Sequence, residues 1–357
     1  MYLLMIVGSV MSCSKTNDSP DVNPGGNNNG SNNGGGNNSL IWSIPISEVL
    51  DGGPGKDGIP ALDAPNFINV QNASYLSDSD LVIGFKDGNE VRAYSHIVLD
   101  WHEIINDNVG DISLAITYCP LTGTGIGWNR VFEDEITTFG VSGLLYNTNL
   151  IPYDRATDSN WSQILNESVN GKLIGQKANL IPLVETNWAT WKKMYPNSKV
   201  VSTETGHSRS YGQSPYGDYA ITDDFFLFPV DKDNRLPLKQ RVMALVDDEK
   251  AKVYKHTPNE IIEDVFNGKN YLVVNGPTFM VAFLISSDPE ALLFEYAYDG
   301  TSDVILKDNQ NNEWNIFGEA VSGPMEGQKL ESAPYFMAYW FSIPAFYETE
   351  IYNPTNN

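Results

Sequence analysis

Apolar and polar residues alternate along much of the chain after residue 80, with the period that β-strands impose. Between residues 82 and 94, two short apolar runs flank the turn dipeptide Asp87-Gly88, which is typical of a β-hairpin. Residues 97–105 have helical spacing, and residues 112–118 form an apolar run that predicts a buried strand. Hairpin signals dominate, and regular strand–helix alternation is absent. We therefore expect an α+β fold, mainly antiparallel β with short helices.

The same pattern occurs twice. Residues 82–94 match residues 242–254 at a constant offset of 160. Farther on, large and special residues recur, at an offset of 152 from Gly175 onward. We therefore predict two pseudo-equivalent internal repeats, about 80–202 and 240–353, each too long for a solenoid unit. The recurring residues are Trp161, Gly171, Gly175, Gln176, Lys177, Pro182, Trp188 and Tyr195, against Trp314, Gly323, Gly327, Gln328, Lys329, Pro334, Trp340 and Tyr347.

The N-terminal residues predict export. A short apolar start ends at Cys13, and it is too short to cross a bilayer, which needs about 20 apolar residues. It resembles a lipoprotein signal peptide, whose cysteine is acylated; an ordinary apolar N-terminus is the alternative. Residues 14–39 are mostly Asn, Gly and Ser, a composition typical of disorder. We expect a protein of the bacterial cell envelope, lipid-anchored through Cys13 at the outer membrane or the periplasmic face.

These patterns divide the chain into five segments. We predict a signal peptide at 1–13, a disordered tether at 14–39, a first repeat with a candidate site at 40–202, a structured connector at 203–239 and a second repeat without the site at 240–357. The sequence leaves open whether the two repeats share one sheet.

The charge balance narrows the classes of partner. The chain has 22 Lys and Arg against 45 Asp and Glu, a formal net charge of −23. Such a field repels phosphate backbones, so we expect no nucleic-acid partner. The acidic residues are dispersed rather than gathered in blocks, as on a solvated surface. The oligomeric state is left open.

The repeat separates scaffold from candidate chemistry. His96 and His256 occupy the same Tyr-x-His place in the two copies, so we interpret both as structural. A gapless alignment of the copies puts Phe279 near the place of the first copy's cysteine. The residues without a counterpart are His102, Cys119 and His207.

Cys119 ends the predicted buried strand and is followed by Pro120 and the glycine-rich run Thr122–Gly125. Glycines at such a place let successive amides converge on an anion or a thiolate. The thiolate is the reactive form of cysteine, and His102 would help by lowering the pKa of the thiol. We therefore predict a catalytic group of Cys119, His102 and Thr122. The alternative is that Cys119 is a small buried hydrophobe.

Other side chains are candidates for binding a substrate or an anion. Arg155 could hold a carboxylate or phosphate bidentately, although a surface pair with Asp154 or a capped helix start is an equal alternative. Ser142, in a run of small residues, and Arg130 are further candidates. Ser142, His102 and Asp154 could be drawn as a hydrolase triad, but the nucleophile-elbow spacing is missing. No phosphate-binding loop, dinucleotide fingerprint or zinc motif occurs.

Six short motifs are spread over most of the chain. They are Asp57-Gly-Ile-Pro60, His102-Glu-Ile-Ile-Asn-Asp107, Thr117-Tyr-Cys-Pro-Leu121, Phe139-Gly-Val-Ser-Gly143, Tyr153-Asp-Arg155 and Pro215-Tyr-Gly-Asp-Tyr219. Together they resemble the bacterial domain-of-unknown-function family 3179, over about residues 45–350. The family has no established activity. Its members commonly carry a Cys-Pro-Leu-Cys pair, and some are described as selenoproteins, so the resemblance implies redox chemistry at this loop.

Thr122 stands where the family pair has its second cysteine. This departure removes a disulfide within the pair and leaves a one-cysteine peroxidatic or sulfenate cycle, resolved by an external thiol.

Three hypotheses about function follow. The first is an envelope redox protein that uses Cys119, with His102 orienting or activating it. The second is a small-ligand or soft-metal module, in which Cys119, His102 and His207 hold copper, because thiolate and imidazole suit this metal. The third is a scaffold lipoprotein without chemistry. The first two predict that the His102 ring lies within hydrogen-bond or ligand range of the Cys119 sulfur.

Overall fold

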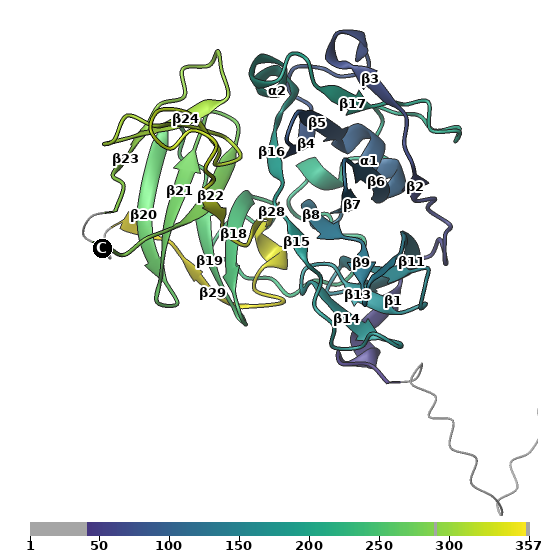
Figure 1. The fold of residues 1–357 in the computed structure, drawn as a ribbon. Coiled ribbons are helices and arrows are strands. Elements are labelled where there is room, and N and C mark those ends of the chain that lie inside the picture. Colours follow the sequence, from purple (N-terminus) through teal and green to yellow (C-terminus); the bar gives the residue numbers. More distant parts are fainter. Residues whose placement is uncertain (1–40, 289–290, 355–357) are drawn as a thin grey trace, which may run out of the picture. The chain divides into compact units, whose positions relative to one another are not determined.

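The computed structural model describes residues 41–288 and 291–354 (Figure 1). These residues belong to one compact unit, residues 38–357. The predicted signal peptide, Cys13 and the whole of the tether lie outside the described residues. In the described ranges, no helix is long and apolar enough to span a membrane. The described chain is mainly β-structure with two short α-helices, α1 (His96–His102) and α2 (Trp188–Met194), as the sequence predicts.

The first half of the described chain forms three five-stranded sheets and a small ribbon of β9 (Val131–Phe132) and β10 (Glu135–Ile136). In order across each sheet, the strands are β16 (Val184–Asn187), β4 (Leu81–Asp87), β5 (Glu90–Ser95), β17 (Lys199–Val201) and β3 (Phe67–Asn69); β15 (Leu180–Ile181), β8 (Thr124–Asn129), β7 (Ile112–Cys119), β6 (Ile104–Val109) and β2 (Leu62–Asp63); and β1 (Val49–Asp51), β11 (Phe139–Tyr146), β12 (Asn149–Asp154), β13 (Asn160–Ser162) and β14 (Glu167–Asn170).

The second half forms three four-stranded sheets. In the same manner, the strands are β28 (Tyr335–Tyr339), β18 (Arg241–Asp247), β19 (Lys250–Lys255) and β29 (Glu348–Ile351); β27 (Glu331–Ser332), β22 (Met280–Ile285), β21 (Lys269–Asn275) and β20 (Glu260–Phe266); and β23 (Phe294–Tyr296), β24 (Val304–Asp308), β25 (Glu313–Asn315) and β26 (Ala320–Ser322). Four single 3₁₀ turns complete the described elements: η2 (Ile46–Glu48), η3 (Val70–Asn72), η4 (Tyr219–Ile221) and η5 (Trp340–Ser342).

The two sets of sheets have matching strand orders. In the first sheet of each set, a central hairpin, β4–β5 or β18–β19, has an antiparallel neighbour on one side and a parallel neighbour on the other. The second and third sheets of the two sets also correspond in strand order, except that each sheet of the first set has one extra edge strand: β3, β2 and β1. The arrangement agrees with the predicted repeat, whereas the duplication itself stays a prediction.

The helix expected over residues 97–105 is shorter than predicted. Glu103 has a left-handed backbone with φ 56°, and this ends α1 at His102. The apolar pair Ile104-Ile105, which fits a helical period, instead begins β6. Strand β7 is buried at seven of its eight positions, which explains its mostly apolar sequence.

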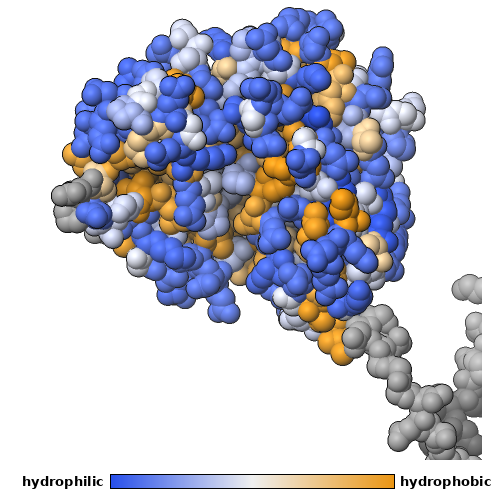
Figure 2. All heavy atoms as spheres, viewed as in Figure 1, coloured by the Kyte–Doolittle hydropathy of each residue, from blue (hydrophilic) through white to orange (hydrophobic). Residues whose placement is uncertain are grey.

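The two halves share one hydrophobic core. A single cluster of buried side chains contains Trp128 and Trp161 from the first half and Phe336 and Trp340 from the second. On the face shown in Figure 2, most of the surface is hydrophilic, in keeping with the dispersed charge.

The connector, residues 203–239, contains one 3₁₀ turn, η4, and is otherwise irregular. Lys239 holds it in shape, since its ammonium group donates hydrogen bonds to the carbonyl oxygens of Tyr219, Thr222 and Phe225. The same group lies 3.6 Å from the centre of the Tyr219 ring. These contacts account for an ordered path in a segment with almost no regular structure.

Candidate functional site

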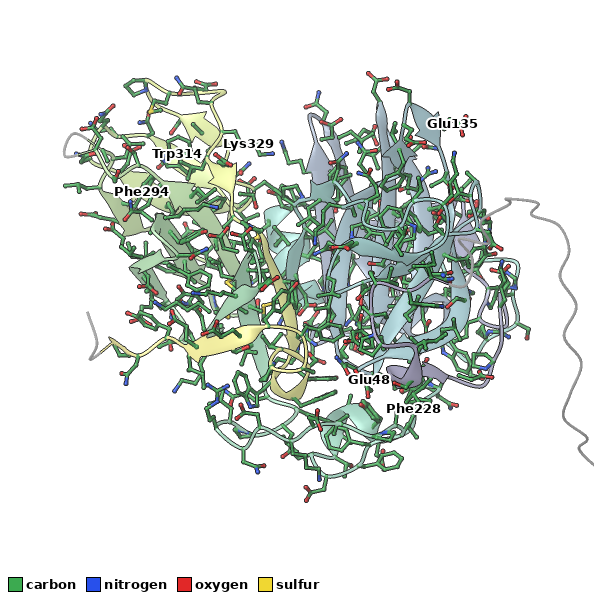
Figure 3. All side chains as sticks on the ribbon, turned by 90° about the horizontal axis from the view of Figure 1, so that it is seen from below. Glu48, Glu135, Phe228, Phe294, Trp314 and Lys329 are labelled. Atoms are coloured by element: carbon green, nitrogen blue, oxygen red, sulfur yellow. The ribbon has the colours of Figure 1, made fainter. Side chains whose placement is uncertain are left out.

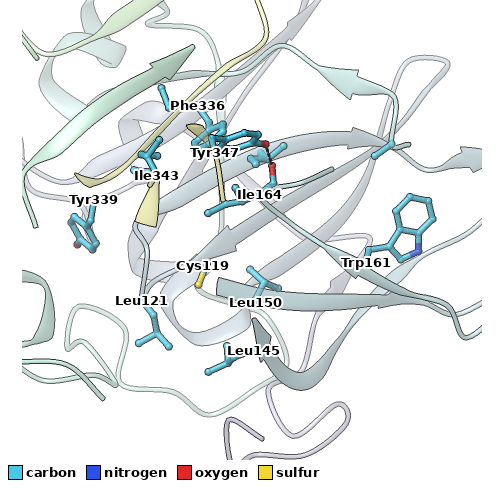
Figure 4. Close-up of a cluster of buried hydrophobic side chains, with 14 of the residues drawn as sticks. Cys119, Leu121, Leu145, Leu150, Trp161, Ile164, Phe336, Tyr339, Ile343 and Tyr347 are labelled. Atoms are coloured by element: carbon cyan, nitrogen blue, oxygen red, sulfur yellow. Dashed lines mark hydrogen bonds between the residues drawn. The ribbon is translucent and has the colours of Figure 1, made fainter. Parts of the chain in front are cut away.

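Cys119, the last residue of β7, lies in the core cluster shared by the two halves and is 1% exposed. Figure 4 shows its sulfur among Leu121, Leu145 and Leu150. The thiol donates a hydrogen bond to the carbonyl oxygen of Thr148, with 3.8 Å between sulfur and oxygen. Burial raises the pKa of the Cys119 thiol to about 11. The thiol is therefore neutral at pH 7.

A buried network of polar side chains adjoins this thiol. The Thr122 hydroxyl accepts a hydrogen bond from Nδ2 of Asn149 at 3.0 Å. A hydrogen bond between the Thr122 side chain and Cys119 lowers the pKa of the thiol and so opposes part of the rise that burial causes. Gln163 extends the network, because its Oε1 accepts from Asn149 at 2.7 Å and its Nε2 donates to the Thr117 hydroxyl at 3.0 Å. The structure thus brings Thr122 to Cys119 and gives this place in the motif a polar environment.

Three successive carbonyl oxygens of the loop after Cys119 accept hydrogen bonds from three other parts of the chain. The connector supplies one donor, and the second half supplies two. The loop is therefore positioned from outside its own sheet. The pairs are Leu121 O with the Tyr219 hydroxyl (2.9 Å), Thr122 O with the Tyr339 N–H (2.8 Å) and Gly123 O with Nη1 of Arg241 (3.0 Å).

Gly123 is required at its place in this loop. Its φ is +63°, and a Cβ there would lie 2.5 Å from Nη1 of Arg241. The guanidinium is held by Glu185 on β16, whose Oε1 accepts from Nη2 at 2.5 Å and whose Oε2 lies 3.2 Å from Nε2 of His96. Burial alone raises the pKa of Glu185, but Arg241 and then His96 outweigh it and hold this pKa at about 2. An ionised carboxylate thus anchors the arginine that holds the loop.

Glu103 is the second unusual group near the thiol. Its carbonyl oxygen accepts from the N–H of Tyr118, the residue before Cys119, at 2.7 Å. Its carboxyl group, in a residue 7% exposed, accepts from the Tyr216 hydroxyl of the connector at 2.8 Å. Burial raises the pKa of Glu103 to about 7, Tyr216 opposes the rise, and Asp100 adds to it. The Glu103 charge in turn raises the pKa of Cys119.

Asp100, on the same helix end, also has a raised pKa. Burial moves it to about 6, against the opposing effect of His96. Asp100 and Glu103, two carboxyl groups with raised pKa values, therefore act on each other, and Glu103 in turn acts on the thiol. Perturbed pKa values and a non-glycine residue in the left-handed region both occur more often at functional sites than elsewhere.

Both ring nitrogens of His102 have partners other than Cys119. Nδ1 lies 2.7 Å from the carbonyl oxygen of Pro60, and Nε2 lies 2.7 Å from the Tyr211 hydroxyl. A carbonyl can only accept, so Nδ1 carries the proton and Nε2 accepts from Tyr211. Burial lowers the pKa of His102 to about 4, and the ring is neutral at pH 7. A catalytic role for His102 stays a prediction, without a contact to the sulfur.

His207, in the connector, folds back over His102, with 5.4 Å between the ring centres. Neither ring contributes a hydrogen bond to Cys119. Within the described residues, no group of three or more His, Cys, Asp or Glu side chains is arranged to hold a metal ion. Copper binding by Cys119, His102 and His207 stays a hypothesis without an assembled set of ligands.

Arg155 and Arg130 both have protein partners. Nη1 of Arg155 lies 3.1 Å from Oδ2 of Asp63, and Nη2 lies 3.5 Å from Oδ1 of Asp57. Arg155 therefore pairs with these two aspartates and not with its neighbour Asp154. The buried Arg130 guanidinium donates to backbone carbonyl oxygens, among them Asp107 O at 2.8 Å. Binding of an anion by either arginine stays a prediction, and it would have to displace or add to these contacts.

Asp154 and Ser142 serve local structure. The fully buried Asp154 carboxylate accepts from the Thr157 N–H at 2.7 Å and from Nε1 of Trp161 at 3.1 Å. The Ser142 hydroxyl donates to Ile151 O across β11–β12, where the pairing shifts register. The three members of the possible triad thus bond to other groups, and their role in chemistry is untested.

Sequence reasoning missed several residues of this site. Glu103, Tyr216 and Tyr219 fall inside motifs that carry the family resemblance, so the resemblance was the signal that could have found them. Arg241 and Glu185 belong to no motif, and the contact between them joins residues 56 positions apart.

Comparison with known families gives one match. The model of the family described as "Protein of unknown function (DUF3179)" matches residues 56–350. No curated protein and no solved structure matches the chain significantly. The match spans well over half of the chain and includes Cys119, Glu103, the connector and Arg241. The chain belongs to the DUF3179 family.

Proposed function

We propose that this chain is a thiol-dependent redox protein, in which Cys119 reacts and Glu103 accepts and returns its proton. The observation that carries the proposal is the pair itself. Glu103 is bonded to the residue before the buried thiol, because its carbonyl oxygen accepts from the N–H of Tyr118 at 2.7 Å. Its buried carboxyl group has a pKa of about 7, and its charge raises the pKa of the thiol. A proton acceptor is most effective when its pKa is near the working pH. Glu103 thus replaces His102 in the role that the sequence first suggests.

The reaction that fits one cysteine is reduction of a hydroperoxide. The Cys119 sulfur attacks the terminal oxygen of the peroxide, an S–O bond forms and the O–O bond breaks. The thiol proton passes to the Glu103 carboxylate, which delivers it to the departing alkoxide, so an alcohol leaves and Cys119 becomes a sulfenic acid. An external thiol then forms a disulfide with Cys119 and releases water. A second thiol restores Cys119 and leaves as a disulfide.

The test measures sulfenic acid formation in the full-length chain. The protein is exposed to tert-butyl hydroperoxide between pH 5.5 and 8.5, the sulfenic acid is trapped with dimedone, and mass spectrometry locates the adduct at Cys119. We expect the rate to rise with pH through an inflection near 7. Glu103→Gln should lose the inflection and react about a hundredfold more slowly at pH 7.5, within the usual range for general base catalysis.

The direction of the change separates catalysis from electrostatics. The Glu103 charge raises the pKa of Cys119, so a purely electrostatic role makes Glu103→Gln react faster. A faster variant, or no adduct at Cys119 in the folded protein, overturns the proposal. The matched control is Glu260→Gln, which changes the exposed glutamate that begins β20 and should leave the rate unchanged.

We also propose that the protein works in the bacterial cell envelope, lipid-anchored through Cys13. The support is the apolar run before Cys13 and the Asn/Gly/Ser-rich stretch after it. The test is metabolic labelling with radioactive palmitate in a bacterial host. Label should enter the wild-type chain and be lost in Cys13→Ala, and equal labelling of the two contradicts the anchor.

A further inference from the structure

A cavity of about 380 Å³ lies between the β11–β12 turn and the connector. Thr148 lines it on one side and Pro229 on the other. Thr148 also borders the thiol, because its carbonyl oxygen accepts the hydrogen bond from Cys119. Thr148 therefore links the cavity to the sulfur.

The Thr148 side chain closes this cavity against the connector. Its hydroxyl donates to the carbonyl oxygen of Pro229 at 3.1 Å. The residue has φ +65°, which is uncommon for a β-branched side chain. Breaking one hydrogen bond between a turn and an irregular segment would open a path to the thiol. Figure 3 shows the same region from below, with Phe228 of the connector beside Glu48 of η2.

The cavity lining combines apolar and acidic side chains. Phe341 belongs to the core cluster that contains Cys119, and Leu50 and Val230 pack against that cluster. Glu48 and Asp231 are its charged lining residues, and no lysine, arginine or histidine lines it. An anionic molecule would meet two carboxylates and no cation there, whereas a neutral apolar molecule would gain by burial.

We propose that this cavity is the substrate site of Cys119 and that it admits neutral apolar hydroperoxides while repelling anionic ones. The inference rests on the proposed reactivity of Cys119 and adds the class of substrate and the route by which it arrives. Thr148 is the gate, and Glu48 and Asp231 select by charge.

The test compares two alkylating reagents that differ mainly in charge. Full-length protein is treated with neutral iodoacetamide or anionic iodoacetate at low ionic strength, and the rate of modification at Cys119 is followed by mass spectrometry. The preference is the rate with iodoacetamide divided by the rate with iodoacetate. In the folded protein it should be about tenfold larger than in the urea-unfolded chain, which is the size expected from two nearby carboxylates. The double variant Glu48→Gln/Asp231→Asn should remove this excess by speeding iodoacetate alone.

The matched control makes the same charge change elsewhere. Asp134→Asn/Glu135→Gln alters two exposed residues, and Figure 3 shows Glu135 far from Glu48; the preference should stay as in the wild type. Thr148→Gly keeps the carbonyl acceptor but removes the hydroxyl that bonds Pro229, and modification of Cys119 by both reagents should become several-fold faster. Thr148→Ser keeps the hydroxyl, so both rates should stay as in the wild type.

The outcomes separate the two proposals. If Cys119 reacts but the double variant Glu48→Gln/Asp231→Asn leaves the iodoacetamide preference unchanged, or Thr148→Gly changes neither rate, the cavity is not the route and this inference is overturned, while the redox proposal stands. If neither reagent modifies Cys119 in the folded protein, the reactivity of the thiol is overturned first, and the substrate site falls with it.

Discussion

The hairpins β6–β7 and β20–β21 are the same structure with and without a thiol. In each, a buried aspartate on the first strand accepts a hydrogen bond from a tyrosine of the neighbouring sheet: Asp107 from Tyr94 at 2.7 Å, and Asp264 from Tyr254 at 2.8 Å. Strand pairing aligns the hairpins at an offset of 157, so Cys119-Pro120 corresponds to Gly276-Pro277. Both halves have a proline at the second of these two positions. Only the first half has a cysteine at the first position.

The halves differ most just before these hairpins. Helix α1 occupies residues 96–102, whereas residues 256–259 make a short turn without a helix. The offset between the halves drops from 160 before this place to 157 after it, so the second half is three residues shorter there. This explains why a gapless alignment put Phe279, rather than Gly276, opposite the cysteine.

The extra helix and the residue after it carry two carboxyl groups with raised pKa values. Asp100 lies on the helix, and Glu103 follows its last residue and is buried, while the corresponding Glu260 is exposed. The connector then covers the first hairpin through Tyr216 and Tyr219. The comparison teaches that the shared frame is scaffold, and that the candidate chemistry gathers where the halves diverge.

The two halves also differ in an ion pair that joins them. Breaking this pair should lower the free energy of unfolding more than the other changes proposed below. Arg241 from the second half meets Glu185 from the first, and the corresponding residues are Leu81 and Met337. Arg241→Gln leaves a largely buried carboxylate without its arginine and a loop carbonyl without its donor. Unfolding in urea should show a loss of about 3 kcal/mol, the low end of the cost of breaking a buried pair, because the Arg241 side chain is 24% exposed.

The double variant Arg241→Gln/Glu185→Gln should cost less than the sum of the two single changes, because no lone charge is left. The control is Lys192→Gln, which breaks an exposed pair with Asp78 and should cost under about 1 kcal/mol. If Arg241→Gln costs no more than this control, the second half does not hold the loop in the way described.

Much of the scaffold could be predicted from the sequence, because its signals are local. Alternation and the Asp87-Gly88 turn identify the β4–β5 hairpin, and its recurrence at residues 242–254 anticipates β18–β19. The end of α1 could not be predicted. Ile104 and Ile105 fit a helical period, and the left-handed backbone of Glu103, which ends the helix, is sustained by tertiary contacts to Tyr118 and Tyr216.

The candidate site was predicted in part. Cys119 and Thr122 lie three positions apart in the sequence and interact in the structure, whereas the role of His102 rests on its residue type alone. Burial, which the sequence does not show, lowers the pKa of His102 and raises that of Glu103. Burial depends on the connector, whose path follows from contacts such as those of Lys239 rather than from any periodicity.

The pH dependence of stability tests the difference between the buried Glu103 of the first half and the exposed Glu260 of the second. The pKa of Glu103 rises from 4.5 in the unfolded chain to about 7 in the fold. The folded state then holds the proton more tightly, so the free energy of unfolding should fall as pH rises from 4.5 to 7, by on the order of 3 kcal/mol. Glu103→Gln should remove this part of the decline and leave the part below pH 6 that the raised pKa of Asp100 causes, whereas Glu260→Gln should keep both.

His102 contributes with the opposite sign, and the comparison of variants isolates Glu103 from it. The pKa of His102 falls to about 4 on folding, so its contribution rises with pH between about 4 and 6.5. The measurement is urea unfolding at pH 5 and pH 8 for the wild type and both variants. Equal pH dependence in the wild type and Glu103→Gln would show that Glu103 titrates normally in the fold.

The smallest expected effects come from the feature that the halves share. Asp107→Asn and Asp264→Asn each weaken a charge-assisted hydrogen bond from tyrosine and an ion pair, with Arg92 in the first half and Lys252 in the second. Each should cost about 2 kcal/mol in urea unfolding, and the two costs should agree within about 1 kcal/mol if the hairpins are equivalent. Neither aspartate contacts the thiol, so the rate of Cys119 alkylation should be unchanged in both variants. A cost confined to Asp107→Asn would mean that the second hairpin copies the geometry of the first without its energetics, and the division into shared scaffold and divergent chemistry would then have to be redrawn.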